Sequence, residues 1–285
     1  MGKNIINFEN IQIGNGQPTF IIAEVGINHN GNFNTAKELI KSAKDSGADA
    51  VKLQTYITEK RVPKDHEVYQ ILKDCELTFK EQEDLFKFGR DMDILIFSTP
   101  FDDESVDFLQ SIECPIFKIA SFDTVNHKLL KKVGNTMKPI IMSTGMTSNE
   151  ELIKARKSLG RDTNLSDSGL ILLHCISSYP MEDNDANLNM ISLLDDIHSG
   201  PVGYSDHSIG IDVPVLAIGK GAHVIEKHFT LDTNQKGPDH AMSADPNTLF
   251  ALVSKIRWAC SVLGENKMGI RETEKKSISF RRFQD

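Results

Sequence analysis

Cysteine is scarce in this chain, and its cysteines are never close together in sequence. The four, Cys75, Cys114, Cys175 and Cys260, form no Cys-x-x-Cys pair in 285 residues. A disulfide framework needs a smaller chain with cysteines at a higher density. We therefore expect reduced thiols, as in a cytoplasmic protein.

Long apolar runs and an excess of basic residues are also missing. No stretch approaches the length of a membrane span, and the first residues lack the apolar core of a secretory signal. Ile6 stands where a myristoylation motif requires Ser or Thr. The formal net charge of −8 argues against nucleic acid or an anionic membrane as the main partner. An anionic ligand would have to be held by local positive groups.

What the chain does contain is a short apolar run, rich in Ile and Val, repeated eight times and followed each time by a helical pattern. This alternation and the chain length are typical of one (β/α)8 TIM barrel, an α/β fold. An apolar content of 39% is sufficient for its core. The predicted strands are Phe20–Ile27, Ala50–Thr55, Ile94–Pro100, Ile116–Ser121, Pro139–Gly145, Leu170–Cys175, Val202–His207 and Val224–Thr230.

The segments around these repeats also carry signals. Residues 4–19 contain two short alternating pieces around Gly14-Asn15-Gly16, which predict a hairpin that closes the barrel floor. Two long connections, Tyr56 to Leu77 and Leu231 to Asp245, should shape a pocket on the catalytic face. Capping boxes predict where the second and fifth helices begin, at Thr78-x-x-Glu81 and Thr147-x-x-Glu150.

Histidines occur at the ends of the last two predicted strands. Residues two apart in a strand point to the same side, so Ser205 and His207 share one side, as do Glu226 and His228. Two imidazoles on neighbouring strands beside a carboxylate suit Mn²⁺, Mg²⁺, Co²⁺ or Zn²⁺ with open positions. Glu226 could bind the ion directly or orient its water. The alternative is a pair of core histidines with a packing role.

Two lysines lie within predicted strands, where a buried ammonium is costly unless an anion pairs with it. Lys52 and Lys118 therefore predict a cradle for phosphate and carboxylate groups. One alternative is a set of buried salt bridges, such as Lys52 with Glu24; another makes Lys118 a Schiff-base nucleophile. Glu24 and Asp239 are candidates for acid–base work or for contacts to substrate hydroxyls. The hydroxyl groups expected beside the lysines are Thr99, Ser121, Ser143 and Ser205.

The strings at these strand ends resemble those of the sialic acid synthase family. The family includes N-acetylneuraminate, legionaminate and pseudaminate synthases and a spore-coat relative. The likeness extends in order from about Phe20 to Leu263. The matching strings are AEVGINHNG, VKLQT, FSTPFD, FKIAS, MSTGM, LLHCISSYP, GYSDHS, VIEKHFTLD and GPDHAMSADP.

The resemblance implies that phosphoenolpyruvate condenses with an N-acetylated hexose such as N-acetylmannosamine, with a divalent ion, Mn²⁺ above all, as cofactor. The products would be a nine-carbon 2-keto sugar acid and phosphate. His207 and His228 would bind the metal, and Glu226 its water. Tyr179 would form part of the pocket wall, and Ser177 stands where some family members carry Asn. Phosphoenolpyruvate would be bound by Lys52, Thr99, Lys118, Ser121, Ser143 and Ser205, and the sugar by Glu24 and Asp239.

Family members form homodimers and usually continue into a small antifreeze-like (SAF) domain that reaches over the partner's barrel. Here we expect a catalytic barrel over residues 1–270, a connector over residues 271–285, and no such domain. A Schiff-base aldolase acting through Lys118 and a catalytically weak barrel that binds a sugar acid remain alternatives.

Overall fold

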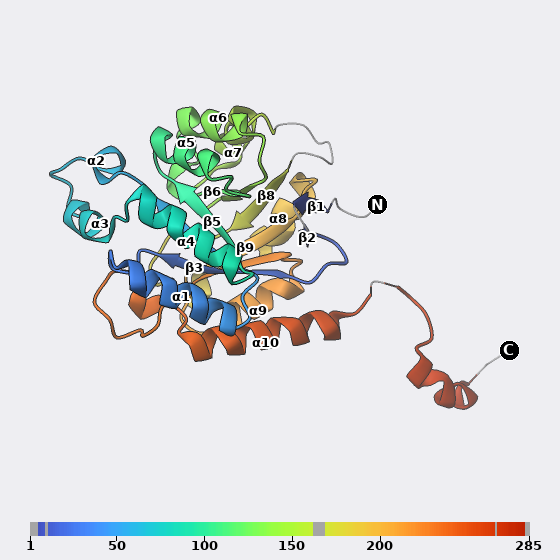
Figure 1. The fold of residues 1–285 in the computed structure, drawn as a ribbon. Helices are drawn as coiled ribbons and strands as arrows, with labels where there is room; N and C mark the ends of the chain where they lie inside the picture. The colour runs from blue at the N-terminus through green and yellow to red at the C-terminus, as the bar shows by residue number, and fades with distance from the viewer. Residues whose placement is uncertain (1–4, 9–10, 162–168, 266, 283–285) are drawn as a thin grey trace.

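Eight parallel strands close into a barrel in the computed structural model, which describes residues 5–8, 11–161, 169–265 and 267–282 (Figure 1). The strand order is β10-β3-β4-β5-β6-β7-β8-β9, so each strand pairs with its sequence neighbours and the last pairs with the first. This confirms the predicted (β/α)8 barrel. The strands are β3 (Phe20–Gly26), β4 (Ala50–Thr55), β5 (Leu95–Pro100), β6 (Phe117–Ile119), β7 (Ile140–Ser143), β8 (Leu170–His174), β9 (Val202–Asp206) and β10 (Val224–His228).

Helices surround the barrel, and α2 and α3 form an extra pair in the connection that follows β4 (Figure 1). The helices are α1 (Phe33–Asp45), α2 (Thr58–Arg61), α3 (Tyr69–Cys75), α4 (Phe79–Asp91), α5 (Asp103–Ser111), α6 (His127–Asn135), α7 (Asn149–Ser158), α8 (Asn189–Ile197), α9 (Asp212–Gly219) and α10 (Pro246–Leu263). Short 3-10 turns are η1 (Ser121–Asp123), η2 (Asp183–Asp185), η3 (His240–Met242) and η4 (Glu272–Phe280). None of the described helices is both long and apolar enough to cross a membrane.

The predicted N-terminal hairpin is present, but its position in the sequence differs. Strands β1 (Ile6–Phe8) and β2 (Ile11–Ile13) pair antiparallel, and both precede Gly14. The prediction placed the two strands on either side of Gly14-Asn15-Gly16, which instead forms the turn that leads into the barrel. The Phe8 ring meets Phe20, at the start of β3, edge to face at 6.3 Å. The hairpin therefore closes the barrel floor, opposite to α2 and α3 (Figure 1).

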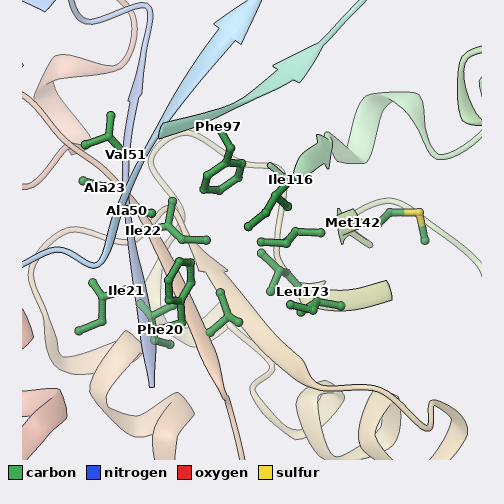
Figure 2. Packing of buried hydrophobic residues seen from close by; sticks show 14 of the residues in the cluster. Phe20, Ile21, Ile22, Ala23, Ala50, Val51, Phe97, Ile116, Met142 and Leu173 are labelled. Carbon is green, nitrogen blue, oxygen red and sulfur yellow. The ribbon is translucent and has the colours of Figure 1, made fainter. Parts of the chain in front are cut away.

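The barrel interior has an apolar lower layer and a polar upper layer. Strand register places Phe20, Ile22 and Phe97 on the inner wall near the floor, while Ile21 and Val51 point outward to the helices. Figure 2 shows this division, with the rings and aliphatic chains of the first group packed together. The next inward positions along the same strands are Glu24, Lys52 and Thr99. The core therefore supports a ring of polar side chains from below.

One predicted capping box is confirmed and the other is wrong by one residue. Thr78 and Glu81 bond reciprocally at the start of α4. At α7 the box is formed by Ser148 and Glu151. Thr147 does not cap because its hydroxyl is directed back to the carbonyl of Gly145.

Candidate active site

A cavity of about 690 Å³ lies at the C-terminal ends of the strands. Its upper wall comes from α2, α3 and the loop that holds Asp239, so both long connections shape it as predicted. Ser177 is the one sequence-predicted site residue outside the lining. The lining includes the other twelve: Glu24, Lys52, Thr99, Lys118, Ser121, Ser143, Tyr179, Ser205, His207, Glu226, His228 and Asp239.

Two lysines and two glutamates form a buried ion network at the cavity floor. The Lys52 ammonium lies 3.2 Å from Glu24 Oε2 and 3.1 Å from Glu226 Oε2. Lys118 Nζ lies 3.8 Å from Glu226 Oε1 and donates to Ser143 Oγ at 2.6 Å. The salt bridge between Lys52 and Glu24, weighed as an alternative to ligand binding, is therefore present. It lies within the cavity wall, so the same side chains form the salt bridge and the predicted binding site for anionic groups.

The network holds these groups in different charge states. Burial raises the pKa of Glu24 to about 7, against the pull of Lys52. Burial also disfavours the charge on Glu226, but Lys118 and Lys52 outweigh it and lower the pKa to about 2. Burial lowers the pKa of Lys118 to about 8, whereas Glu226 and Glu24 overcome burial and raise the pKa of Lys52. Near neutral pH the floor combines two cations with one fully ionised carboxylate, which favours an anionic ligand.

The two predicted imidazoles lie side by side at the cavity wall. The His207 and His228 rings are 5.5 Å apart between centroids, and the Tyr179 ring lies 4.2 Å from His207. His207 Nδ1 donates to the carbonyl of Ile176 at 2.7 Å, which leaves Nε2 with its lone pair. His228 Nδ1 is buried 3.6 Å from Asp239 Oδ2, and no described residue forms a hydrogen bond with it. Burial lowers the pKa of both histidines, so both rings are neutral near pH 7.

These features fit a divalent ion held by two protein ligands. A ligating histidine is neutral, and its second ring nitrogen is commonly bonded to a carbonyl, as in His207. The orphaned Nδ1 of His228 also fits, because a buried polar atom without a partner is costly. Across the described part of the chain, no cluster of three or more His, Cys, Asp or Glu has metal-binding geometry. An ion here would rely on the two imidazoles, with substrate or water as further ligands.

A cluster of small polar side chains forms one side of the cavity. Ser121 Oγ lies 3.0 Å from Cys175 Sγ and accepts a hydrogen bond from the Gly145 amide at 3.0 Å. A side chain at Gly145 would meet Ser177 Oγ, Cys175 Sγ and Ser121 Oγ within 2.9 Å, so this close approach requires glycine. Ser177 therefore lies behind Gly145, where its buried hydroxyl forms no hydrogen bond with any residue in the described part of the chain.

Sequence reasoning missed several polar residues of the cavity lining, and two of them, Gln54 and Arg61, connect to Glu24. Arg61 Nη1 donates to Gln54 Oε1 at 3.0 Å, and Gln54 Nε2 donates to Glu24 Oε1 at 3.1 Å. Strand parity could have identified Gln54, because it follows the inward Lys52 by two residues. Arg61 had no such signal, because it lies at the end of a short helix in a long connection.

A second buried ion pair lies directly behind the histidines. Lys227 Nζ donates to Asp206 Oδ2 at 2.5 Å and to the Ser208 carbonyl at 2.8 Å. Both side chains point outward from the barrel, because Asp206 precedes His207 and Lys227 precedes His228. The pair joins β9 to β10 at the height of the two imidazoles.

Comparison with known proteins finds relatives along most of the chain. Residues 39–268 match the NeuB family. An uncharacterised protein of Methanocaldococcus jannaschii is 48% identical over 90% of this chain and 75% of its own length. The N,N'-diacetyllegionaminic acid synthase of Legionella pneumophila is 41% identical over 94% of this chain and 82% of the synthase. The crystal structure of an N-acetylneuraminic acid synthetase from Leptospira borgpetersenii, in complex with citrate, matches with a TM-score of 0.93 at 38% identity, over 98% of this chain and 97% of that chain.

Proposed function

Because this chain belongs to the NeuB family, we propose that it condenses phosphoenolpyruvate with an N-acetylated hexosamine of the N-acetylmannosamine type. The products would be a nine-carbon 2-keto sugar acid and inorganic phosphate. The names of two relatives, a legionaminic acid synthase and a sialic acid synthetase, support a sugar acid as the product.

The observation that carries the proposal is the juxtaposition of two buried lysines with two neutral imidazoles in one cavity. Lys52 and Lys118 share Glu226, which neutralises only one of their two charges. An enol phosphate has a phosphate and a carboxylate, and charge-assisted hydrogen bonds from ammonium and hydroxyl groups would hold both. Ser143 and Ser205 already bond Lys118 and Glu226, so these hydroxyls are preoriented.

Specific residues would position the substrates, activate the aldehyde and stabilise the charge that develops in the reaction. Lys52 and Lys118 would hold phosphoenolpyruvate so that its C3 faces C1 of the open-chain sugar aldehyde. A divalent ion such as Mn²⁺, held by His207 and His228, would supply Lewis-acid polarisation of the aldehyde oxygen. As the C3–C1 bond forms, positive charge develops at C2, and the fixed charge of Glu226 would stabilise it.

Water then adds to C2, and the C2–O bond to phosphate breaks, so the bridging oxygen leaves with the phosphate. The proton lost by the attacking water needs an acceptor near the reacting carbons. Glu24 lines the cavity beside Lys52, and burial raises its pKa to about 7, close to the value that favours a general base. We assign proton transfer to Glu24.

The experiment measures phosphate release from phosphoenolpyruvate with Mn²⁺ across a panel of N-acetylated hexosamines. Phosphoenolpyruvate labelled with ¹⁸O in the bridging position should give labelled phosphate. The His207→Ala variant should release phosphate at least about a hundredfold more slowly, because removing a catalytic electrostatic group has an effect of this size. Unlabelled phosphate, or a His207→Ala variant as fast as the parent, would contradict the proposal.

One observation favours a second candidate function, that of a Schiff-base aldolase. The pKa of Lys118, lowered by burial to about 8, is suited to a Schiff-base nucleophile. A metal-free aldolase acting through Lys118 would be trapped by borohydride in the presence of substrate and would be insensitive to EDTA. The proposed synthase should show the opposite response in both assays.

A further inference from the structure

Arg61 occupies an unusual position for a residue in a long connection. It ends α2 and lies at the cavity wall, with its guanidinium carbon 3.6 Å from the centre of the Phe101 ring and 4.7 Å from that of Tyr56. Such stacking fixes the plane of a guanidinium and leaves its edges available for hydrogen bonds. The side chain is therefore held in one orientation.

The two aromatic rings are themselves anchored. Tyr56 is buried in a small apolar cluster separate from the main core, together with Ile27, Leu72 and Cys75. The Tyr56 hydroxyl donates to the Leu72 carbonyl at 2.9 Å, which ties the end of β4 to α3. Phe101 packs against this cluster and meets Tyr56 edge to face. Arg61 thus rests on a rigid platform built by the long connection.

Hydrogen bonds lead from this platform to the cavity floor. Arg61 donates to the side-chain oxygen of Gln54, Oε1, which fixes the side-chain amide so that its nitrogen donates to Glu24 Oε1. Glu24 Oε2 in turn faces Lys52 at 3.2 Å. Gly26 allows this approach, because a side chain there would lie 3.2 Å from Glu24 Oε1 and 3.3 Å from Gln54 Nε2.

Most of the Arg61 donors are still available. A guanidinium has five N–H groups, and among the described residues Arg61 makes one side-chain hydrogen bond, to Gln54. The carboxylates of Asp123, Asp239 and Glu24 act electrostatically on the Arg61 guanidinium, so a further anion would be repelled there. The free donors therefore suit a neutral oxygen, either an amide carbonyl or a hydroxyl.

We propose that Arg61 is a specificity-determining and positioning residue for the acceptor sugar. It holds Glu24 in place through Gln54, and it donates its remaining N–H groups to a neutral oxygen of the acceptor. This inference rests on the proposed condensation with an N-acetylated hexosamine. Phosphoenolpyruvate would be bound at the floor by Lys52 and Lys118, and Gln54 and Glu24 lie between Arg61 and Lys52.

Steady-state kinetics of the full chain tests the specificity role. Arg61→Met should raise the KM for the acceptor about tenfold or more, as expected for the loss of hydrogen bonds from a charged donor, while the KM for phosphoenolpyruvate stays within twofold. Arg61→Lys should not restore the acceptor KM, because an ammonium group cannot stack as a plane on Phe101 and lacks the several N–H donors that a guanidinium holds in fixed directions. Lys64→Met removes an exposed positive charge from the same connection and should match the parent. Equal changes in both KM values, or none, would overturn the inference.

A double-mutant cycle tests the link through Gln54. If Arg61 acts on Glu24 through Gln54, then Gln54→Met should lower kcat, and adding it to Arg61→Met should cost clearly less than the product of the two single effects. If the effects of Gln54→Met and Arg61→Met on kcat simply multiply, Arg61 does not position Glu24 through Gln54, and that part of the proposal is wrong.

A crystal structure of Arg61→Met tests the same link without turnover. The Gln54 amide should rotate away from Glu24; an unchanged Gln54–Glu24 bond would contradict the link. A parent enzyme that releases no phosphate with any acceptor would contradict the proposed function instead, and the crystal structure would still decide the link.

Discussion

Strand β10 contributes to buried ion pairs on both of its faces, and the two sets differ in how completely they are bonded. On the outer face, Lys227 and Asp206 bond each other, and the neighbouring Ser208 bonds both. On the inner face, Glu226 is shared by Lys52 and Lys118. The two sets lie on opposite faces of the same sheet, and removing charges from water is costly in each.

The inner set leaves polar atoms without hydrogen bonds, and the outer set does not. Among the described residues, Thr99 Oγ1 and His228 Nδ1 are buried without a hydrogen bond, whereas Glu24 Oε2 and Glu226 Oε2 share one ammonium group, that of Lys52; all four atoms belong to residues that line the cavity. Leaving such atoms unbonded is costly, so folding alone does not favour this arrangement. The comparison therefore assigns a structural role to the outer pair, Lys227 with Asp206. It assigns a ligand-binding role to the inner set around Glu226.

The largest expected effect concerns the outer pair. Lys227→Met leaves the Asp206 carboxylate buried without its partner, so the free energy of unfolding should fall by about 3–5 kcal/mol. The double variant Asp206→Leu, Lys227→Met should recover most of this loss. Urea denaturation followed by circular dichroism measures both.

The surface pair of Lys132 with Asp107, 2.7 Å apart, serves as the matched control. Lys132→Met should cost less than about 1 kcal/mol because solvent screens an exposed pair. A Lys227→Met variant as stable as Lys132→Met would remove the structural role of the outer pair.

The second effect concerns the inner set, where a substitution should lower activity strongly and change stability little. Lys118→Met removes a buried charge but leaves Lys52 and Ser205 in contact with Glu226, so the free energy of unfolding should change by less than about 1 kcal/mol. The kcat/KM for phosphoenolpyruvate should fall about 10²–10³-fold, the usual cost of losing one preorganised electrostatic group. Parallel denaturation and phosphate-release assays measure the two. A stability loss as large as that of Lys227→Met would show that Lys118 is structural.

A smaller effect should appear in the pH dependence of ligand binding. Burial lowers the pKa of Lys118 to about 8, so its charge is present below that pH and is lost above it. The Kd of phosphoenolpyruvate should then rise above about pH 8, by at most about tenfold per pH unit. Calorimetric titration between pH 7 and pH 9.5 measures this rise. Lys118→Met should lack it, and an equal rise in that variant would assign the titration to another group.

The smallest effect lies outside both charge sets. Ser148→Ala removes the side-chain cap of α7, so the free energy of unfolding should fall by about 1 kcal/mol. Ser148→Asp keeps a side-chain acceptor for the backbone amide of Glu151 at the same helix end and should stay close to the parent. Thermal unfolding compares the two variants. A change in kcat/KM for either would mean that this helix start is coupled to the cavity.

Much of the barrel could be predicted from sequence because its signal is local. Every predicted strand is present. The errors fall where neighbours decide the outcome. Strand β6 is three residues long because Ser121 already begins the turn η1, and Ser148 replaces Thr147 as the cap because Thr147 bonds Gly145. Such preferences depend on contacts that a single strand or helix pattern does not contain.

The inner charge set could also be predicted, because alternation along a strand places Glu226 with His228 on one side. Arg61 could not, because its position depends on how Tyr56 and Phe101 pack the long connection against the barrel. The pairing of Lys227 with Asp206 needs the register between β9 and β10, which the sequence does not state.

The most direct test of the central claim is a crystal structure of the chain with phosphoenolpyruvate and Mn²⁺, with anomalous diffraction to locate manganese. The account predicts a manganese peak within coordination distance of His207 and His228, and phosphate and carboxylate oxygens in contact with Lys52 and Lys118. Manganese elsewhere, or phosphoenolpyruvate bound away from the two lysines, would contradict it.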